Sequence, residues 1–348
     1  MTSFLTIAAI VAGVLVLCAA ILLLFTLYTA RKVEALLPSK GRFVDVPGAR
    51  LHIRDFGEQR PDEPAIVMIH GLAGQLSHYT YGVVGRLAER HRIVVIDRPG
   101  SGYSSRASGT AADLSTQASS IAALIRALGL GRALVVGHSL GGAVALTLAL
   151  EHPEQVAGLA LLAPLTHMRE DVPPVFAGLT IQSPLVRKLV AWTLAIPASI
   201  KNSAATLEVV FGPEPVPKDF ATKGGGLLSL RPSAFLSASS DLQALPERLP
   251  QVQARYPELR LPVHVLYGKD DRILDWKANG QALVDKVPGA RLELVEGGHM
   301  LPVTQPAATA EFIEAALAAL TRPPHSPAPP PAPSGHTASS APPHPASC

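Results

Sequence analysis

The sequence predicts an α/β fold, in which a mainly parallel sheet of eight strands is covered by helices on both faces. Short apolar segments of strand length alternate with segments of helical pattern from about residue 43 to residue 320. This alternation is typical of a parallel sheet that is buried on both faces. Reactive residue types also follow several of the apolar segments directly, and the reactive groups of such sheets gather at the carboxyl ends of the strands.

The expected elements begin with a β-hairpin, whose turn falls at Pro47-Gly48. Each later strand is a short apolar run, and a helical pattern separates most of these runs from the next. The expected strands span residues 43–46, 50–55, 65–69, 92–96, 133–136, 158–162, 262–267 and 291–295. The expected helices span residues 81–90, 114–128, 140–152, 276–286 and 307–320.

The alternation stops in an insertion at about residues 165–251, after the sixth strand. This segment is interrupted by prolines and by three successive glycines, and it contains several short helical patterns. Leu185, Leu189 and Trp192 fall at helical spacing within it. An apolar stripe of this kind usually faces a core, but here it lies between two sheet strands and fits a cap over a site equally well. We therefore expect a small helical lid.

The N-terminal run from Phe4 to Tyr28 carries no charge. At about 1.5 Å per residue, a helix of this length spans the roughly 30 Å hydrocarbon core of a bilayer. A secretory signal has a shorter apolar region of about 7–15 residues behind a basic start, whereas no Lys or Arg precedes this run. We expect an uncleaved, single-pass transmembrane anchor over residues 1–32. Arg31 and Lys32 follow the run and favour a cytoplasmic domain behind it, although large domains are also translocated regardless of flanking charge.

A globular domain is expected over residues 40–321, followed by a tail over residues 322–348 that is rich in Pro, Ala, Ser and His and is expected to be disordered. The net charge of +3 and the lack of a basic cluster argue against a nucleic-acid partner. Cys18 and Cys348 are not placed to staple a core. No HExxH or CxxC spacing is present, so neither a metal nor another cofactor is expected.

Gly137-His138-Ser139-Leu140-Gly141 joins the strand at 133–136 directly to the helix at 140–152. A strand that turns straight into a helix needs small residues at the corner, because the two backbones crowd there. The pattern G-x-S-x-G therefore predicts a strained turn that exposes the hydroxyl of Ser139 above the edge of the sheet. Small residues also join strands to helices where no chemistry occurs, so a catalytic interpretation needs a base, an acid and an oxyanion site elsewhere in the chain.

Candidate partners for Ser139 follow later strands. Asp270 and Asp271 come after the strand at 262–267, and His299 comes after the strand at 291–295. Serine, aspartate and histidine, each just beyond a strand, form the chain order of one type of catalytic triad. Either aspartate is a candidate for the acid, and Glu170 or Asp171, which follow the sixth strand, are further alternatives.

The chain resembles the α/β-hydrolase superfamily over about residues 43–321. The resemblance rests on His70-Gly71, Asp97-Arg98-Pro99-Gly100-Ser101-Gly102, Gly137-His138-Ser139-Leu140-Gly141-Gly142, Gly268 to Asp271, and Gly298-His299. It implies that Ser139 is the nucleophile, His299 the general base and Asp271 the acid, because the aspartate of the family usually lies three residues after the glycine that ends its strand. It also implies an oxyanion hole formed by the backbone N–H groups of Leu72 and Leu140, and a lid after the sixth strand.

The nucleophile narrows the reaction that this resemblance implies. Haloalkane dehalogenases and epoxide hydrolases of the superfamily carry aspartate at the position of Ser139. Carbon–carbon bond hydrolases often carry asparagine before the serine, whereas His138 is more typical of esterases and lipases. With the anchor and the apolar lid, this predicts a serine esterase or lipase-like enzyme whose substrates are small-molecule or lipid esters with hydrophobic acyl groups. A carbon–carbon bond hydrolase, an acyltransferase that uses the same acyl-serine and a non-catalytic binding scaffold remain as alternatives.

Overall fold

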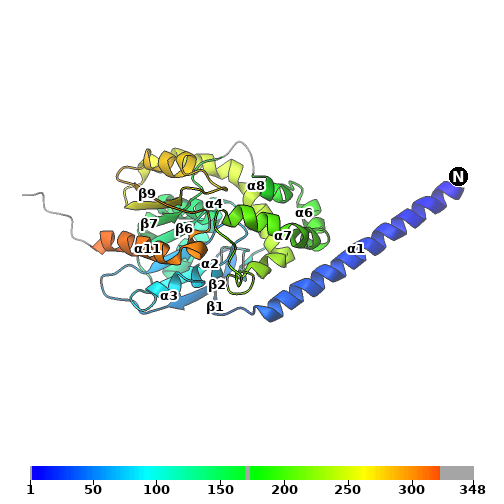
Figure 1. The fold of residues 1–348 in the computed structure, drawn as a ribbon, viewed down its shortest axis with the longest axis horizontal. Coiled ribbons are helices and arrows are strands. Elements are labelled where there is room, and N and C mark those ends of the chain that lie inside the picture. The colour runs from blue at the N-terminus through cyan, green and yellow to red at the C-terminus, as the bar shows by residue number, and fades with distance from the viewer. Residues whose placement is uncertain (1, 169–172, 322–348) are drawn as a thin grey trace, which may run out of the picture.

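One nine-stranded sheet organises the chain within residues 2–168 and 173–321, which are the residues that the computed structural model describes (Figure 1). The strands are β1 (Arg42–Val46), β2 (Ala49–Phe56), β3 (Ile66–Ile69), β4 (Ile93–Ile96), β5 (Ser105–Arg106), β6 (Ala133–His138), β7 (Val156–Leu162), β8 (Val263–Gly268) and β9 (Arg291–Val295). Their order across the sheet is β1-β2-β4-β3-β6-β7-β8-β9, and β5 pairs with β2. The pairs from β4 to β9 are parallel, whereas β2 runs antiparallel to its neighbours β1, β4 and β5.

The predicted α/β fold with a mainly parallel sheet is confirmed, but the described residues form nine strands and not eight. Each of the eight expected strands is present, and its ends lie within two residues of the expected ones. The additional strand is β5, which pairs with Ala49 and Arg50 of β2. Two residues are too few for alternation of apolar and polar side chains to show, so the sequence pattern could not reveal this strand.

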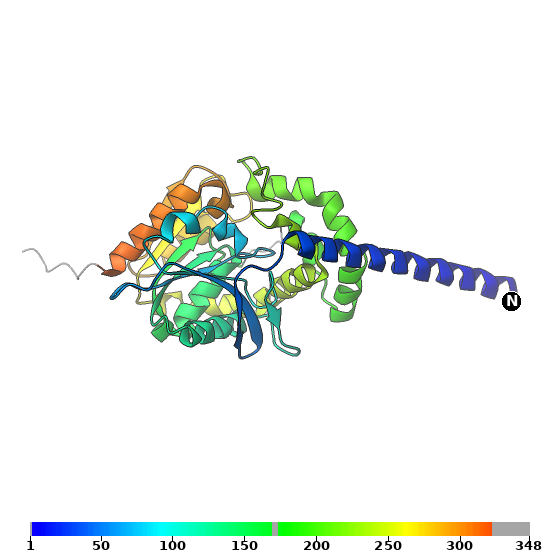
Figure 2. The ribbon, with the colours of Figure 1, turned by 90° about the horizontal axis from the view of Figure 1, so that it is seen from below.

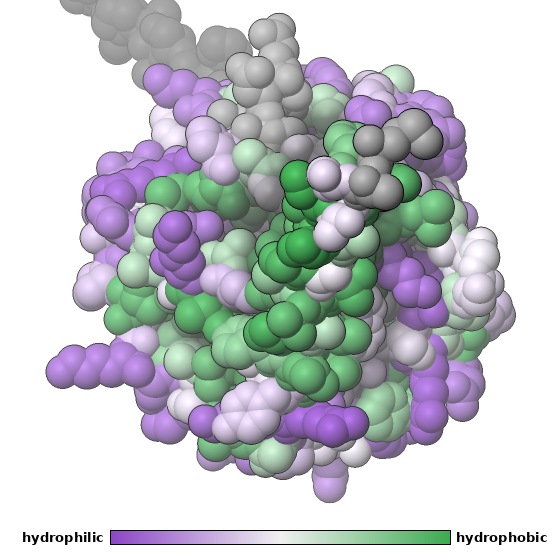
Figure 3. Space-filling model, turned by 90° about the vertical axis from the view of Figure 1, so that its right-hand side faces the viewer, coloured by the Kyte–Doolittle hydropathy of each residue, from purple (hydrophilic) through white to green (hydrophobic). Residues whose placement is uncertain are grey.

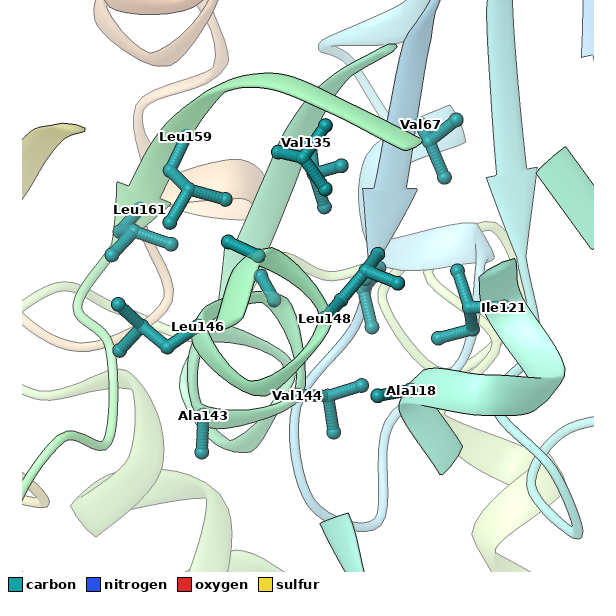
Figure 4. Close-up of a cluster of buried hydrophobic side chains, with 14 of the residues drawn as sticks. Val67, Ala118, Ile121, Val135, Ala143, Val144, Leu146, Leu148, Leu159 and Leu161 are labelled. Atoms are coloured by element: carbon teal, nitrogen blue, oxygen red, sulfur yellow. The ribbon is translucent and has the colours of Figure 1, made fainter. Parts of the chain in front are cut away.

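Helices cover both faces of the sheet (Figures 1 and 2). On one face, α4 (Leu114–Ala127), α5 (Leu140–Glu151) and α8 (Pro232–Ala254) pack over one set of strand side chains. On the other face, α3 (Val84–Leu87) and α11 (Pro306–Thr321) pack over the alternate set. Within β6, Val135 belongs to the first layer, where it lies near α5 in Figure 4, while Leu134 and Val136 belong to the second. Burial on both faces is the reason that the strands read as continuous apolar runs.

Two expected helices differ from the structure. Residues 81–90 were expected to form one helix, but they contain only the single-turn α3, and the single-turn α2 (Ser77–Thr80) precedes it. Residues 276–286 form a π-helical turn, Lys277–Gln281, and the short α9 (Ala282–Val284). In both places apolar residues at helical spacing pack against the sheet from short turns, which leave the same spacing in the sequence as one longer helix. The short α10 (Leu301–Thr304) lies just before α11.

The insertion between β7 and β8 is helical. It contains α6 (Pro184–Trp192), α7 (Ala195–Phe211), a 3₁₀ turn at Gly226–Leu230, and most of α8. The apolar stripe on α6 does not face a core, because Leu185 is 81% exposed and Leu189 is 63% exposed.

The N-terminal helix α1 (Thr2–Leu36) extends away from the rest of the molecule (Figures 1 and 2). It is long and apolar enough to cross a membrane, and its most apolar stretch is not buried against the protein. Only its C-terminal part contacts the body, where it packs against α6, α7 and the turn at Gly226–Leu230. The expected tail at residues 322–348 lies outside the described residues.

Candidate active site

Ser139 lies at the sharp turn between β6 and α5, with φ 54° and ψ −122°. A positive φ is strained for a residue that has a side chain, and it directs Ser139 to the carboxyl edge of the sheet. The two glycines that bracket the turn are required by crowding. A Cβ atom at Gly137 would lie 2.5 Å from the carbonyl oxygen of Gly141, and one at Gly141 would overlap the carbonyl oxygen of Ile69. The predicted strained turn is therefore present.

The loops after β8 and β9 bring an aspartate and a histidine together. Nδ1 of His299 donates a hydrogen bond of 2.7 Å to Oδ2 of Asp271. The other oxygen, Oδ1, accepts from the backbone N–H groups of Ile273 and Leu274 at 2.8 and 2.9 Å. The Asp271 side chain is fully buried, whereas Asp270 is exposed. Asp271 is thus the aspartate that faces the imidazole, and its carboxylate is held by three donors.

His299 and Ser139 line the same cavity. Since Nδ1 of His299 donates to Asp271, its Nε2 has a lone pair that is suited to accept a proton. In the described part of the chain, Nε2 makes no hydrogen bond to Oγ of Ser139, and in unliganded enzymes this contact is often long until substrate binds. Nε2 of His138 donates to the carbonyl oxygen of His299 at 2.9 Å, which ties the loop that carries His299 to the strand that carries the serine.

The loop after β3 lies directly against the serine. A Cβ atom at Gly71 would be 2.8 Å from Cβ of Ser139, so glycine is needed for this close approach. Leu72, the next residue, lines the cavity, as does Leu140. Leu140 is the first residue of α5, where a backbone N–H has no acceptor within the helix and the helix dipole favours negative charge. The two backbone segments predicted to form the oxyanion hole therefore border one space beside Ser139.

A cavity of about 840 Å³ opens above these groups, within the size range of ligand sites. Its floor is formed by the residues around Ser139 and His299, and its walls come mainly from the insertion. Most of the wall residues are apolar, among them Phe176, Leu179, Leu207, Val210, Phe220 and Leu245.

The family model for the α/β hydrolase fold matches residues 64–206 of the chain. A solved membrane phospholipase A, described as a bacterial virulence factor, is 26% identical, with a TM-score of 0.62 over 92% of this chain and 99% of that one. A 2-hydroxy-6-oxononadienedioate/2-hydroxy-6-oxononatrienedioate hydrolase of Burkholderia vietnamiensis is 27% identical over 70% of this chain and 82% of its own length.

The chain has the α/β-hydrolase fold. The dihydrolipoyllysine-residue acetyltransferase component of the acetoin cleaving system of Cupriavidus necator is 34% identical, but only over 36% of this chain. The chain matches about a third of that protein's length, 32%. The match to the membrane phospholipase A covers 92% of this chain, whereas residues 40–348 make up only about 89% of it. The match therefore includes part of the segment before residue 40.

A buried arginine joins the loop after β3 to the insertion; we call this loop, at residues 70–74, the oxyanion loop, after the predicted role of Leu72. The guanidinium of Arg98 donates to the carbonyl oxygens of His70 and Gly71 at 2.9 and 3.0 Å. It also pairs with Asp241 of α8 at 2.7 Å, and both side chains are fully buried. Arg106 donates to the second oxygen of Asp241 at 2.8 Å. The motif around Arg98 was recognised in the sequence, but Asp241 was missed, because a single aspartate in a helix has no distinguishing pattern.

A second contact from the insertion holds the loop after β9 that carries His299, which we call the histidine loop. Oε2 of Glu214, which follows α7, accepts from the backbone N–H of Gly298 at 2.8 Å. Its Oε1 accepts from the side chain of Gln305 at 3.2 Å. Glu214 therefore positions the residue that directly precedes His299. No local sequence pattern marks Glu214, since it lies more than 80 residues from the loop that it contacts.

Three histidines around Ser139 have lowered pKa values, which disfavours their charged forms. Burial and the charge of Arg98 lower the pKa of His70 well below its usual range, and its ring accepts from the backbone of Arg98 while donating to the Gly71 carbonyl. Burial lowers the pKa of His78 to about 4. Burial and the neighbouring His299 also lower the pKa of His138.

The structure thus gathers Ser139, Asp271, His299, Leu72 and Leu140 at one site, while their catalytic roles stay predictions. The alternative acids Glu170 and Asp171 lie outside the described residues. Within the described ranges, no cluster of three His, Cys, Asp or Glu side chains is placed to hold a metal ion.

Proposed function

We propose that the chain is a membrane-anchored serine esterase that cleaves carboxylic esters with hydrophobic acyl groups. The observation that carries this proposal is that Ser139 and His299 line one large, mainly apolar cavity, while Asp271 holds His299 from behind through a 2.7 Å hydrogen bond. An acyl chain would bury its apolar surface against the walls of the cavity, while its carbonyl carbon meets the serine.

The reaction follows from the chemistry of these groups. Oγ of Ser139 attacks the ester carbonyl carbon, and Nε2 of His299 takes the hydroxyl proton. Asp271 keeps the imidazole in the required tautomer and stabilises its charged form. The oxyanion accepts hydrogen bonds from the backbone N–H groups of Leu72 and Leu140, and losing one such donor typically costs about 3–4 kcal/mol.

The reaction is then completed in two stages, each of which ends with the breakdown of a tetrahedral intermediate. His299 returns its proton to the departing alkoxide, which leaves as an alcohol and gives the acyl-serine. Water then attacks the acyl carbon, and His299 takes one of its protons. When the second intermediate breaks down, His299 gives this proton back to Oγ of Ser139 and the carboxylic acid is released.

The proposed domain organisation is an anchor over residues 1–32 and a catalytic domain over residues 40–321 with a lid at about 165–251. The length and apolar composition of α1 support the anchor, as does the likeness to a membrane phospholipase A that extends into the N-terminal segment. Arg31 and Lys32 follow the apolar run, so we propose that the catalytic domain faces the cytoplasm.

Acyl transfer is the second candidate function. The match to the acetyltransferase component supports it, because an acyl-serine passes its acyl group to whichever nucleophile reaches it first. Product analysis separates the two functions: with a long-chain alcohol or amine present, a transferase yields the acylated acceptor, whereas an esterase yields the free acid.

The proposal is tested with the full chain in detergent micelles beside Ser139→Ala. Both proteins are assayed against p-nitrophenyl esters from acetyl to palmitoyl. We expect hydrolysis by the parent chain, with a preference for longer acyl groups, and a loss of at least about a thousandfold in kcat for the variant. A parent chain that neither hydrolyses these esters nor reacts at Ser139 with a fluorophosphonate probe would refute the esterase proposal.

A further inference from the structure

The outer face of the insertion exposes a patch of large apolar side chains, which we call the α6 patch. It consists of Leu185, Val186 and Leu189 on α6, Leu194 in the turn that follows, and Ile200 on α7, with exposed fractions of 81%, 48%, 63%, 55% and 42%. Such gatherings on a protein surface mark a site of contact with another apolar surface. Burial in the core of the fold does not account for these side chains, because each is more than 40% exposed.

Helix α1 lies against the same insertion. Thr26 of α1 is fully buried and Val33 is 5% exposed, and both lie in the part of α1 that packs on α6, α7 and the turn at Gly226–Leu230. Figure 3 views the molecule from this side, where hydrophobic surface gathers in the middle and hydrophilic residues surround it. The α6 patch and the apolar helix therefore belong to the same end of the molecule.

The position of Thr26 along α1 sets the depth of this contact. The uncharged run from Phe4 to Tyr28 is about 37 Å long as a helix, whereas the hydrocarbon core is about 30 Å thick. If the run begins at one face of this core, its last few residues lie at the opposite boundary between lipid and water. Thr26 is among these residues, so the insertion that covers it lies at that boundary.

We propose that the α6 patch inserts into the leaflet from which α1 emerges. The protein then contacts the bilayer through both α1 and the α6 patch. This inference rests on the membrane anchor of the proposed function. The charges favour a lipid surface as the occupant, because residues 184–207 contain Arg187, Lys188 and Lys201 and no acidic residue. An apolar helix face flanked by basic residues is the usual pattern of an interfacial helix on anionic lipids.

The cavity adjoins this surface. Ile200 belongs to the α6 patch and also lines the cavity, together with Ser199 and Ser203 on the same helix. A lipid ester therefore enters the cavity from the leaflet beside α7 and does not have to cross water. The proposed occupant thus also supplies the substrate.

A depth measurement tests the contact directly. The full chain carrying Cys18→Ser and Cys348→Ser is labelled with a fluorophore at Leu189→Cys or, as a matched control, at Ala319→Cys. Ala319 is exposed on α11, away from α1 and α6 in Figure 1. In nanodiscs of phosphatidylcholine and phosphatidylglycerol, we expect brominated acyl chains to quench the label at position 189 and not at position 319.

Two results would overturn the inference. In the first, brominated lipids do not quench the label at position 189, but an aqueous quencher does. The other is a label shielded from both quenchers, which would indicate a second copy of the chain or another protein on the patch.

Activity gives a second, independent readout. We expect Leu185→Glu/Leu189→Glu to lower hydrolysis of a long-chain ester embedded in vesicles by about tenfold or more, because charged side chains oppose insertion of the patch. Hydrolysis of soluble p-nitrophenyl acetate should stay within about twofold, and Ala315→Glu/Ala319→Glu should change neither activity. Unchanged vesicle hydrolysis would contradict the inference. If the parent chain hydrolyses no ester, the proposed function fails, while the quenching measurement still decides whether the patch contacts lipid.

Discussion

Ser139 is held in a conformation that its own side chain disfavours. Its positive φ persists because β6 and α5 are both packed into the core on either side of the turn, and strain of this kind is retained where the surrounding structure over-determines it. The backbone at Ser139 is thereby held in place without a ligand. Positioning of this kind lowers the barrier of a reaction, since little freedom remains to be lost on the way to the transition state.

Glu214 should be a positioning residue for the histidine loop. Glu214→Ala removes the acceptor of the Gly298 N–H, a hydrogen bond to a charged group of the kind typically worth about 1.5–3 kcal/mol. We expect kcat for a soluble ester to fall about tenfold with KM nearly unchanged, because the imidazole is displaced while the cavity is retained. Glu214→Gln should recover most of the activity, since an amide oxygen can accept the same hydrogen bond. Equal losses in the two variants would show that the contact with Gly298 is not what matters.

Local chemistry explains which site residues could be predicted. Ser139 and its glycines were identifiable because steric crowding at the turn restricts the residues over a five-residue window. Asp271 and His299 were identifiable because each directly follows a strand, and the structure places their side chains 2.7 Å apart. Glu214 and Asp241 act across long separations in sequence, so no local pattern marks them.

Among the elements, α8 and the oxyanion loop are joined through the buried pair of Asp241 and Arg98. Asp241→Ala leaves two guanidinium groups, those of Arg98 and Arg106, without their carboxylate. Breaking a buried pair in this way costs about 3–5 kcal/mol, and we expect a loss of this size in the free energy of unfolding measured with urea. Glu258→Ala is the matched control, since its pair with Arg255 is exposed and should contribute less than about 1 kcal/mol. Similar losses in both variants would contradict this account.

The accuracy with which each helix and strand was predicted depended on how regular its pattern of apolar residues is. The buried strands and the helices α4, α5 and α11 were predicted with nearly correct ends, because each is a continuous apolar or periodic run. The segment at 276–286 was not, since a π-helical turn and a short helix place side chains at almost the same spacing as one helix. The stripe on α6 illustrates a further limit: periodicity shows that one face of a helix is apolar, but not whether protein or lipid covers that face.

On the scale of the whole molecule, the end of α1 is tied to the loops around the site. The hydroxyl of Tyr103 donates to the carbonyl oxygen of Leu37, and Nε2 of His52 bonds that of Lys40 at 2.8 Å. His52 in turn contacts Asp97 at 2.7 Å, and Asp97 accepts from the backbone N–H of Leu76 at 2.8 Å, just beyond the oxyanion loop. A continuous set of hydrogen bonds thus links the end of α1 to the loops that follow β3 and β4.

Removal of α1 should release the protein from membranes. We expect the full chain to remain in the membrane fraction after an alkaline carbonate wash, and residues 40–321, which retain Lys40, to appear in the soluble fraction. Mass spectrometry of the full chain should find the N-terminal segment intact. A mature protein that begins beyond residue 28 would instead identify the segment as a cleaved signal sequence and contradict the anchor.

The uncharged histidines beside Ser139 also bear on how a reaction cycle would end. Hydrolysis converts a neutral ester into a carboxylate, and the new negative charge appears next to His78 and His138, whose lowered pKa values leave them without a positive charge. Beyond the backbone N–H groups of Leu72 and Leu140, the cavity wall is mainly apolar and solvates a carboxylate poorly, so the product is less well accommodated there than the ester was. The cavity would therefore bind the acid product more weakly than the ester substrate. Release of the product would then not limit the rate of turnover.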